Sequence, residues 1–215
     1  MHKKQHGYPD LRAISNTLVA AYRATTSLAY PDLAPTSLAE SKTNYANPGT
    51  YDLVGNVTWN SLGWSGFSES NYLNTGIVMP DDSQTWSVFI KYSGNGGAYY
   101  PTLFGTTDGV NAYGLLYFIW STNTIIASIN GAGVVIPIGD GFTQMAIVGN
   151  AVYANLVNVG TLPLGTYNHN LSTYIGCRNF NGAGNLPWSG QIQGAIFYSS
   201  VITDVAGVMS ILQAC

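Results

Sequence analysis

Hydrophobic and polar residues alternate along much of this chain with the period of two that a β-strand imposes on its side chains. The clearest example is residues 72–93. In its second half one face holds Trp86, Val88, Ile90 and Tyr92, and the other holds Ser87, Phe89 and Lys91. A Pro-Asp-Asp-Ser sequence at residues 80–83 has the composition of a turn. We therefore predict that residues 72–93 form a β-hairpin.

Further short strands are predicted at close spacing, separated by glycine, asparagine and aspartate. They cover residues 51–58, 62–67, 98–105, 114–121, 124–129, 134–138, 142–149, 151–159, 174–179 and 191–199. Residues 11–23 fit a short helix or an edge strand, and we favour a strand for 18–23. Gly149 and Asn150 have the composition of a tight turn. Because no internal repeat is visible, we predict an all-β fold, a two-sheet antiparallel jelly-roll sandwich.

The two ends of the chain differ from this pattern. Residues 203–214 predict a short C-terminal helix. Its expected cap is Thr203, and its inward-facing residues are Val205, Val208, Met209 and Leu212. Residues 24–50 contain three prolines and predict a long loop. We expect an N-terminal arm at residues 1–17 and a single jelly-roll domain at 18–215.

Charge is scarce in this chain and concentrated at its beginning. Only 8% of the 215 residues are charged, against about 25% in ordinary globular proteins. The net charge of −3 argues against nucleic acid as the main partner. Lys3, Lys4 and Arg12 would concentrate any contact with an acidic partner in the arm, although a solvated tail is the favoured explanation for them.

The sequence also bears on export, membrane insertion and cysteine chemistry. The first 22 residues are too polar for a signal peptide, and the longest apolar runs, 115–120 and 131–139, are too short to span a membrane. Two cysteines do not make a disulfide scaffold or a zinc site. We expect Cys177 to be a buried thiol and Cys215 a free terminal thiol, although a bridge between them stays open.

Four segments in order resemble a known superfamily. Residues 64–76 contain an aromatic residue followed by Y-L-x-T-G, and residues 86–91 follow as a Trp-containing strand ending in Lys. Residues 174–179 read YIGCRN, and 188–198 contain W-x-G-x-I before a final I-x-Y. With the helix after Ile202, this order resembles laminin-G-like, concanavalin A-like jelly rolls over about residues 18–214.

That resemblance implies a function as well as a fold. Free-standing domains of this family are frequent in bacteriophage virions, as tail-fibre or capsid-decoration modules. It therefore implies a non-enzymatic structural or adhesion component of a phage virion, with other virion proteins as partners. Because a low-charge surface is normally covered by partners, we also expect a homo-oligomer, a trimer by preference. The alternative is a lectin-like, carbohydrate-binding module at the bacterial surface or outside the cell.

Catalytic patterns are missing from the sequence. A retaining glycosidase needs two carboxyl groups about 5 to 5.5 Å apart, but Glu40 and Glu69 stand alone and Asp81–Asp82 reads as a turn. The histidines lie in the arm or, at His169, in a predicted loop, and no Gly-x-Ser-x-Gly sequence is present. We expect no enzyme activity, with a glycoside hydrolase or polysaccharide lyase as the weakest alternative.

Candidate ligand residues are exposed aromatic and amide side chains in predicted loops, which suit either a glycan or a protein partner. They are Tyr99, Tyr100, Tyr113, Tyr167, Asn168, His169 and Asn185. Trp188 fits a ligand site and the core equally well, whereas the other tryptophans are expected in the core. No cofactor is predicted. Asp108 with Asn111, and Asp140, are weak calcium candidates, because an Asp-Gly turn explains each aspartate better.

Overall fold

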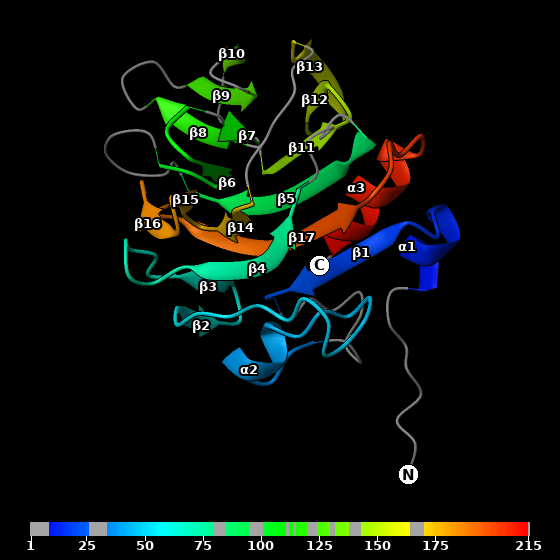
Figure 1. Cartoon of the computed structure of the whole chain (residues 1–215). Coiled ribbons are helices and arrows are strands. Elements are labelled where there is room, and N and C mark those ends of the chain that lie inside the picture. The colour runs from blue at the N-terminus through cyan, green and yellow to red at the C-terminus, as the bar shows by residue number, and fades with distance from the viewer. Residues whose placement is uncertain are drawn as a thin grey trace.

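The computed structural model (Figure 1) describes residues 9–25, 34–79, 85–94, 101–110, 112–113, 115–119, 124–129, 132–137, 143–163 and 170–214. In these residues most of the ordered elements are β-strands, arranged in three sheets with helices at their margins. The two larger sheets enclose a common hydrophobic core. The predicted all-β jelly-roll sandwich with a short C-terminal helix is therefore confirmed.

The largest sheet has eight strands in the order β13-β12-β11-β5-β17-β3-β2, with β1 also paired to β17. Its strands are β1 (Leu18–Arg23), β2 (Thr58–Asn60), β3 (Gly63–Ser65), β5 (Ser87–Ser93), β11 (Gln144–Val148), β12 (Ala151–Ala154), β13 (Val157–Thr161) and β17 (Gln191–Tyr198). β17 pairs with β5 along seven positions and with β1 along five. Strands distant in the sequence are thus adjacent at the centre of the sheet.

The second sheet has the order β16-β15-β6-β14-β4, with β7 also paired to β6. Its strands are β4 (Leu73–Val78), β6 (Phe104–Thr107), β7 (Ala112–Tyr113), β14 (Ser172–Ile175), β15 (Arg178–Phe180) and β16 (Ala183–Asn185). β15 runs parallel to β6, a departure from the antiparallel pattern. A third, smaller sheet consists of β8 (Leu115–Ile119), β9 (Thr124–Ile129) and β10 (Ala132–Pro137).

The predicted alternation along β5 is confirmed. Val88 and Ile90 belong to the core between the two large sheets. Phe89 faces the opposite way and belongs to a second apolar cluster. The helix α3 (Val205–Ala214) contributes Met209 and Leu212 to this second cluster. Figure 1 shows α3 lying against β5 and β17, so this helix covers part of the sheet's outer face.

The predicted hairpin at residues 72–93 is wrong. β4 pairs with β14 in the second sheet, whereas β5 pairs with β11 and β17 in the first. The intervening residues 80–84 lie outside the described ranges. Alternation specifies which side of a strand is buried but says nothing about its partner. Both apolar faces are buried by packing the two strands in opposite sheets of the sandwich.

Part of the segment predicted as an N-terminal arm, residues 1–17, packs against the domain. Residues from Pro9 to Ile14 form helix α1, and Leu11 is buried in the second cluster. The hydroxyl group of Tyr198 donates to the carbonyl oxygen of Leu11 at 3.2 Å. Burial of Leu11 therefore joins residues 11–17 to the body of the domain. Residues 1–8, including Lys3 and Lys4, lie outside the described ranges.

Several element boundaries differ from those predicted. The expected loop contains a short helix, α2 (Leu38–Ser41), whose cap Ser37 accepts a hydrogen bond from Glu40 N. The strand expected at 151–159 is two strands joined at Asn155–Leu156, and the one expected at 174–179 breaks at Gly176. A strand expected at 51–58 begins only at residue 58. Residues with positive φ interrupt two of these strands, at Asn155–Leu156 and at Gly176.

The structure also tests the predictions for one turn, one cysteine and the cap of the C-terminal helix. Gly149 and Asn150 form the predicted two-residue turn between β11 and β12, and Cys177 is a buried free thiol, whereas Cys215 lies outside the described residues. Asp204, rather than Thr203, caps α3, because its Oδ1 accepts from Gly207 N at 2.9 Å. None of the helices in the described part of the chain is long and apolar enough to cross a membrane.

Candidate functional site

A short hairpin at the edge of the second sheet presents aromatic, cationic and amide groups together. Its strands, β15 and β16, are joined by Asn181 and Gly182, which both have positive φ, 51° and 89°. Asn-Gly is the preferred pair for this mirror-image turn, because both residues tolerate the left-handed region. The local sequence therefore favours a tight hairpin, and the register pairs Arg178 with Asn185.

Hydrogen bonds to neighbouring strands hold this turn in place. Asn179 accepts from Gly182 N through Oδ1 at 2.8 Å and donates from Nδ2 to Ser172 O at 2.6 Å. The hydroxyl group of Tyr174 donates to Gly182 O at 3.0 Å. Asn179 is itself buried, so its amide acts as an internal anchor for the hairpin. The side chains on the opposite face of β15 are thus carried on a fixed backbone.

That opposite face holds Arg178, Phe180 and Asn185, which we call the β15–β16 platform. Arg178 and Phe180 are two residues apart on one strand and therefore share a face. The guanidinium carbon of Arg178 lies 5.4 Å from the centroid of the Phe180 ring, within cation–π range. Nη2 of Arg178 also donates to Oδ1 of Asn185. Phe180 is 38% exposed, so an apolar ring edge is accessible beside polar groups.

The loop that follows β6 lies beside the platform. A Cβ atom at Gly109 would lie 3.5 Å from Cε2 of Phe180, an ordinary van der Waals distance, so the loop backbone lies beside the ring. Oδ1 of Asp108 accepts from Val110 N at 2.8 Å, which closes an Asx turn. This is the turn role that the sequence favoured over calcium binding for Asp108. Its proposed calcium partner, Asn111, lies outside the described residues.

Two stacked tyrosines and a buried thiol lie close to the hairpin. The rings of Tyr72 and Tyr174 are 4.2 Å apart and nearly parallel. Burial raises the pKa of Tyr174, and the neighbouring Tyr72 hydroxyl raises it further. Burial also raises the pKa of Cys177 to about 11, although hydrogen bonds with backbone groups act in the opposite direction. Both groups are therefore neutral at physiological pH and serve packing rather than charge.

The structure brings only part of the predicted ligand set to this surface. Asn185 lies in the platform, and the backbone of Tyr113 pairs with β6, the strand that also pairs with β15. The other predicted ligand residues fall outside the described ranges: Tyr99, Tyr100, Tyr167, Asn168 and His169. The same is true of the weak calcium candidate Asp140. Arg12, predicted to contact a partner, donates to the carbonyl oxygen of Ala46 in its own chain.

The described tryptophans contribute mainly to the core, whereas Trp120, also expected there, lies outside the described ranges. Trp188, for which core and ligand roles fitted equally well, is fully buried against the ring of Tyr92. Trp64 is also buried, while Trp59 and Trp86 are partly buried against the core. Neither Phe180 nor Arg178 belongs to the predicted ligand set. The signal that could have identified them was the Asn-Gly turn at 181–182, with its flanking residues paired across it.

Several of the described carboxylates stabilise turns and helix ends. Glu40 accepts from Thr36 at 2.9 and 2.7 Å, and Asp52 accepts from the backbone amides of Asn44 and Gly49. Asp204 caps α3. Within the described ranges, no group of three or more His, Cys, Asp or Glu side chains is arranged to hold a metal ion. The platform is suited to reversible binding of a ligand through stacking and hydrogen bonds.

Comparisons with known proteins identify structural neighbours only. No protein-family model matches the chain, and no curated protein matches its sequence. Domain 4 of AbnA, an extracellular GH43 arabinanase of Geobacillus stearothermophilus solved in complex with arabinotriose, is 20% identical with a TM-score of 0.52. The alignment covers 92% of this chain and 98% of that domain. At this identity the likeness shows a shared fold.

Two sialidase structures align over less of the chain. The CBM40 of Ruminococcus gnavus IT-sialidase has 12% identity and a TM-score of 0.47, covering 65% of this chain and 91% of that one. The K499G mutant of the Streptococcus pneumoniae sialidase NanB has 13% identity and a TM-score of 0.43, covering 56% of this chain. The alignment spans only 23% of the length of the NanB chain.

Proposed function

We propose that this chain is a non-catalytic carbohydrate-binding domain and that the β15–β16 platform belongs to its ligand surface. The observation that carries the proposal is the convergence of Phe180, Arg178 and Asn185 on one face of a hydrogen-bonded hairpin. A sugar offers an apolar C–H face to an aromatic ring and hydroxyl groups to amide and guanidinium groups. The platform supplies all three kinds of partner within one cross-strand unit.

The fold supports the same proposal. The arabinanase domain, which matches nearly the whole chain, was solved with an arabino-oligosaccharide bound. A shared fold does not transfer a ligand, since one fold carries many functions. It supports the proposal because a domain with the same fold binds an arabino-oligosaccharide. The virion role and the trimer expected from the sequence stay predictions.

The first test is a glycan array with the full chain, covering neutral and acidic oligosaccharides and including arabinotriose and sialyllactose. Affinity for any glycan that binds is then measured by calorimetry for the wild type and for Phe180→Ala and Arg178→Ala. We expect each substitution to weaken binding at least about tenfold, equivalent to about 1.4 kcal/mol. Lost stacking explains the first effect and lost hydrogen bonding the second.

Tyr51→Ala is the matched control, because Tyr51 is an aromatic residue of similar exposure, 43%, outside the platform. It should leave affinity unchanged, provided that thermal unfolding shows a folded protein. If no oligosaccharide on the array binds, the proposed function is wrong. If a glycan binds equally well to all four proteins, the function holds but the platform is not its site.

A further inference from the structure

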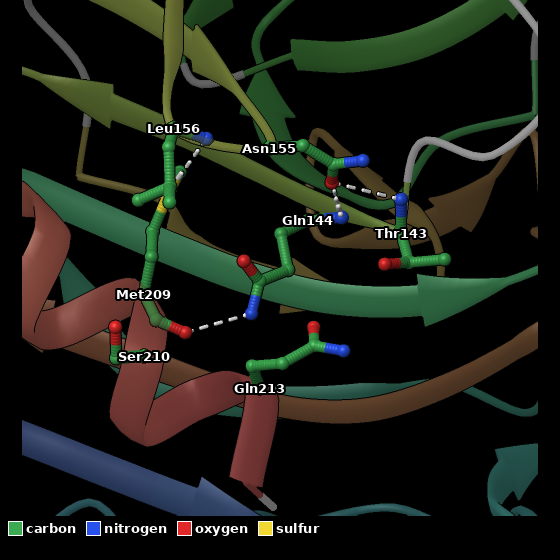
Figure 2. Close-up of a pocket in the computed structure, with 7 residues that line it drawn as sticks. All are labelled: Thr143, Gln144, Asn155, Leu156, Met209, Ser210 and Gln213. Atoms are coloured by element: carbon green, nitrogen blue, oxygen red, sulfur yellow. Dashed lines mark hydrogen bonds between the residues drawn. The ribbon is translucent and has the colours of Figure 1, made fainter.

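A second possible site lies on the other large sheet, at the junction of β11, the turn between β12 and β13, and helix α3 (Figure 2). This pocket has a volume of about 480 Å³, within the range of small-molecule sites. Its lining consists of Thr143, Gln144, Asn155, Leu156, Met209, Ser210 and Gln213. All seven side chains are uncharged. It shares no residue with the β15–β16 platform.

Gln144 contributes a largely buried polar side chain to this pocket. The residue is only 4% exposed. Its Nε2 donates to the carbonyl oxygen of Met209 at 2.8 Å, and because a carbonyl can only accept, this bond fixes the orientation of the amide. Figure 2 shows the amide oxygen turned away from that carbonyl. Oε1 has no hydrogen-bond partner among the residues that the structure describes, so a ligand donor would satisfy it.

The turn at the rim of the pocket has an unusual residue. Asn155 and Leu156 occupy the two central positions between β12 and β13, with φ of 43° and 72°. Glycine is preferred at the second position, because a side chain there is strained. The chain itself uses Asn-Gly for the equivalent turn at 181–182. Leu156 is nevertheless 53% exposed, so burial in the core does not explain why leucine occupies this strained position.

Contacts on both sides keep this strained turn in one conformation. Oδ1 of Asn155 accepts from the backbone amides of Thr143 and Gln144 at 3.1 and 3.0 Å. The backbone amide of Leu156 donates to the sulfur atom of Met209 at 3.3 Å. Figure 2 shows these bonds linking the turn to β11 on one side and to α3 on the other. Strain that is maintained in this way is characteristic of binding sites.

Helix α3 adds further polar groups to the rim. Val208, Met209 and Leu212 are buried beneath the helix, which leaves Ser210 and Gln213 exposed on one side of it. Ser210 and Gln213 are three residues apart and are therefore neighbours on the helix surface. Within the described part of the chain, neither the Ser210 hydroxyl nor the Gln213 side-chain amide has a hydrogen-bond partner. Both can donate to and accept from a ligand.

We propose that this pocket is a second binding site, for an uncharged, hydroxyl-rich small molecule such as a neutral monosaccharide or the end of a neutral glycan. One ligand hydroxyl donates to Oε1 of Gln144, and others bond to Ser210 and Gln213. The apolar face of the ligand packs on Leu156 and Met209. An ionised ligand is disfavoured, because no charged side chain lines the pocket to offset its desolvation. The proposal goes beyond the platform and does not depend on it.

The test is an NMR titration of the isotopically labelled full chain with L-arabinose, D-galactose, D-glucose and myo-inositol, each up to tens of millimolar. Glucuronate serves as the charged comparison. We expect at least one neutral probe to shift the amide signals of residues 143–144, 155–156 and 209–213 in a saturable way, and glucuronate to shift them at least tenfold more weakly. If none of the neutral probes shifts these signals, the proposal is overturned.

Leu156→Gly separates binding from folding. Because Asn-Gly suits this turn, the variant should unfold at the same temperature as the wild type or a higher one, while its affinity for the neutral probe falls at least tenfold. Gln213→Ala should weaken binding severalfold. Val157→Ala, at the adjacent exposed residue, is the control and should leave the affinity for the neutral probe unchanged. Unchanged affinity in both Leu156→Gly and Gln213→Ala would overturn the proposal. Phe180→Ala should leave the affinity of the pocket for the neutral probe unchanged. The two proposed sites can therefore be tested independently.

Discussion

The side-chain nitrogen of Lys91 lies 2.8 Å from the backbone carbonyl oxygen of Gln213, so a lysine from β5 binds the last turn of helix α3. Carbonyl groups at a helix C-terminus lack partners within the helix, and a cation there also interacts favourably with the helix dipole. This contact adds a polar link to the apolar packing of the C-terminal helix against the central strands of the larger sheet. It leads to a prediction about stability.

Replacing Lys91 with methionine removes the charge and the hydrogen bond but keeps an aliphatic chain of similar length. We expect the free energy of unfolding to fall by about 0.5–1 kcal/mol, measured by urea denaturation at low salt. Lys91→Arg should retain most of the stability. Gln213→Ala should also retain it, since the accepting group belongs to the backbone. Equal stability of Lys91→Met and wild type would show that the contact contributes nothing.

The N-terminus of α3 gives a second prediction, which compares two adjacent residues. Asp204→Ala removes the acceptor for Gly207 N and should destabilise the protein by about 1 kcal/mol. Thr203→Ala should have little effect, because Thr203 is exposed and precedes the cap. Thermal or urea unfolding of the two variants distinguishes them. The opposite ranking would return the cap to Thr203, the residue first expected from the sequence.

Two glycines with similar backbone angles make a matched pair for a third prediction. Gly176 has φ +75°, and a Cβ atom there would lie 2.1 Å from Cε1 of the buried Phe67 ring. Gly49 has φ +87° with no atom within 4 Å of the corresponding position. Gly49→Ala should cost about 1 kcal/mol from backbone strain alone, and Gly176→Ala roughly 3 kcal/mol or more. Comparable losses in chemical denaturation would contradict a close contact at Phe67.

The buried thiol gives a prediction about alkaline pH. Because burial raises the pKa of Cys177 from 9.0 to about 11, the unfolded chain releases its thiol proton at a lower pH than the folded chain. The contribution of the protonated Cys177 thiol to the free energy of unfolding is thus fully present below pH 9. It is lost as the pH rises from 9 toward 11. In a Cys215→Ser background, adding Cys177→Ala should flatten the decline of the urea midpoint between pH 8 and 10. An unchanged slope would show that the thiol is not protected by burial.

The sequence alone was sufficient for features that depend on local chemistry. Period-two alternation indicated which side of β5 faces the core, as Val88 and Phe89 show by lying in different clusters. Turn composition located Gly149–Asn150, and the apolar spacing of residues 205–212 placed the inner face of α3. These features follow from bond geometry and from the burial of apolar side chains, which each segment determines for itself.

Pairing and site formation were decided only by the tertiary structure. β4 and β5 are consecutive in the chain yet lie in opposite sheets, because a strand's partner depends on which arrangement buries all apolar faces together. β15 is three residues long, too short to show a period, so Phe180 and Arg178 were not visible as a ligand pair. The pocket at Gln144 brings together β11, a turn and a helix that lie up to 70 positions apart, and only packing brings such groups together.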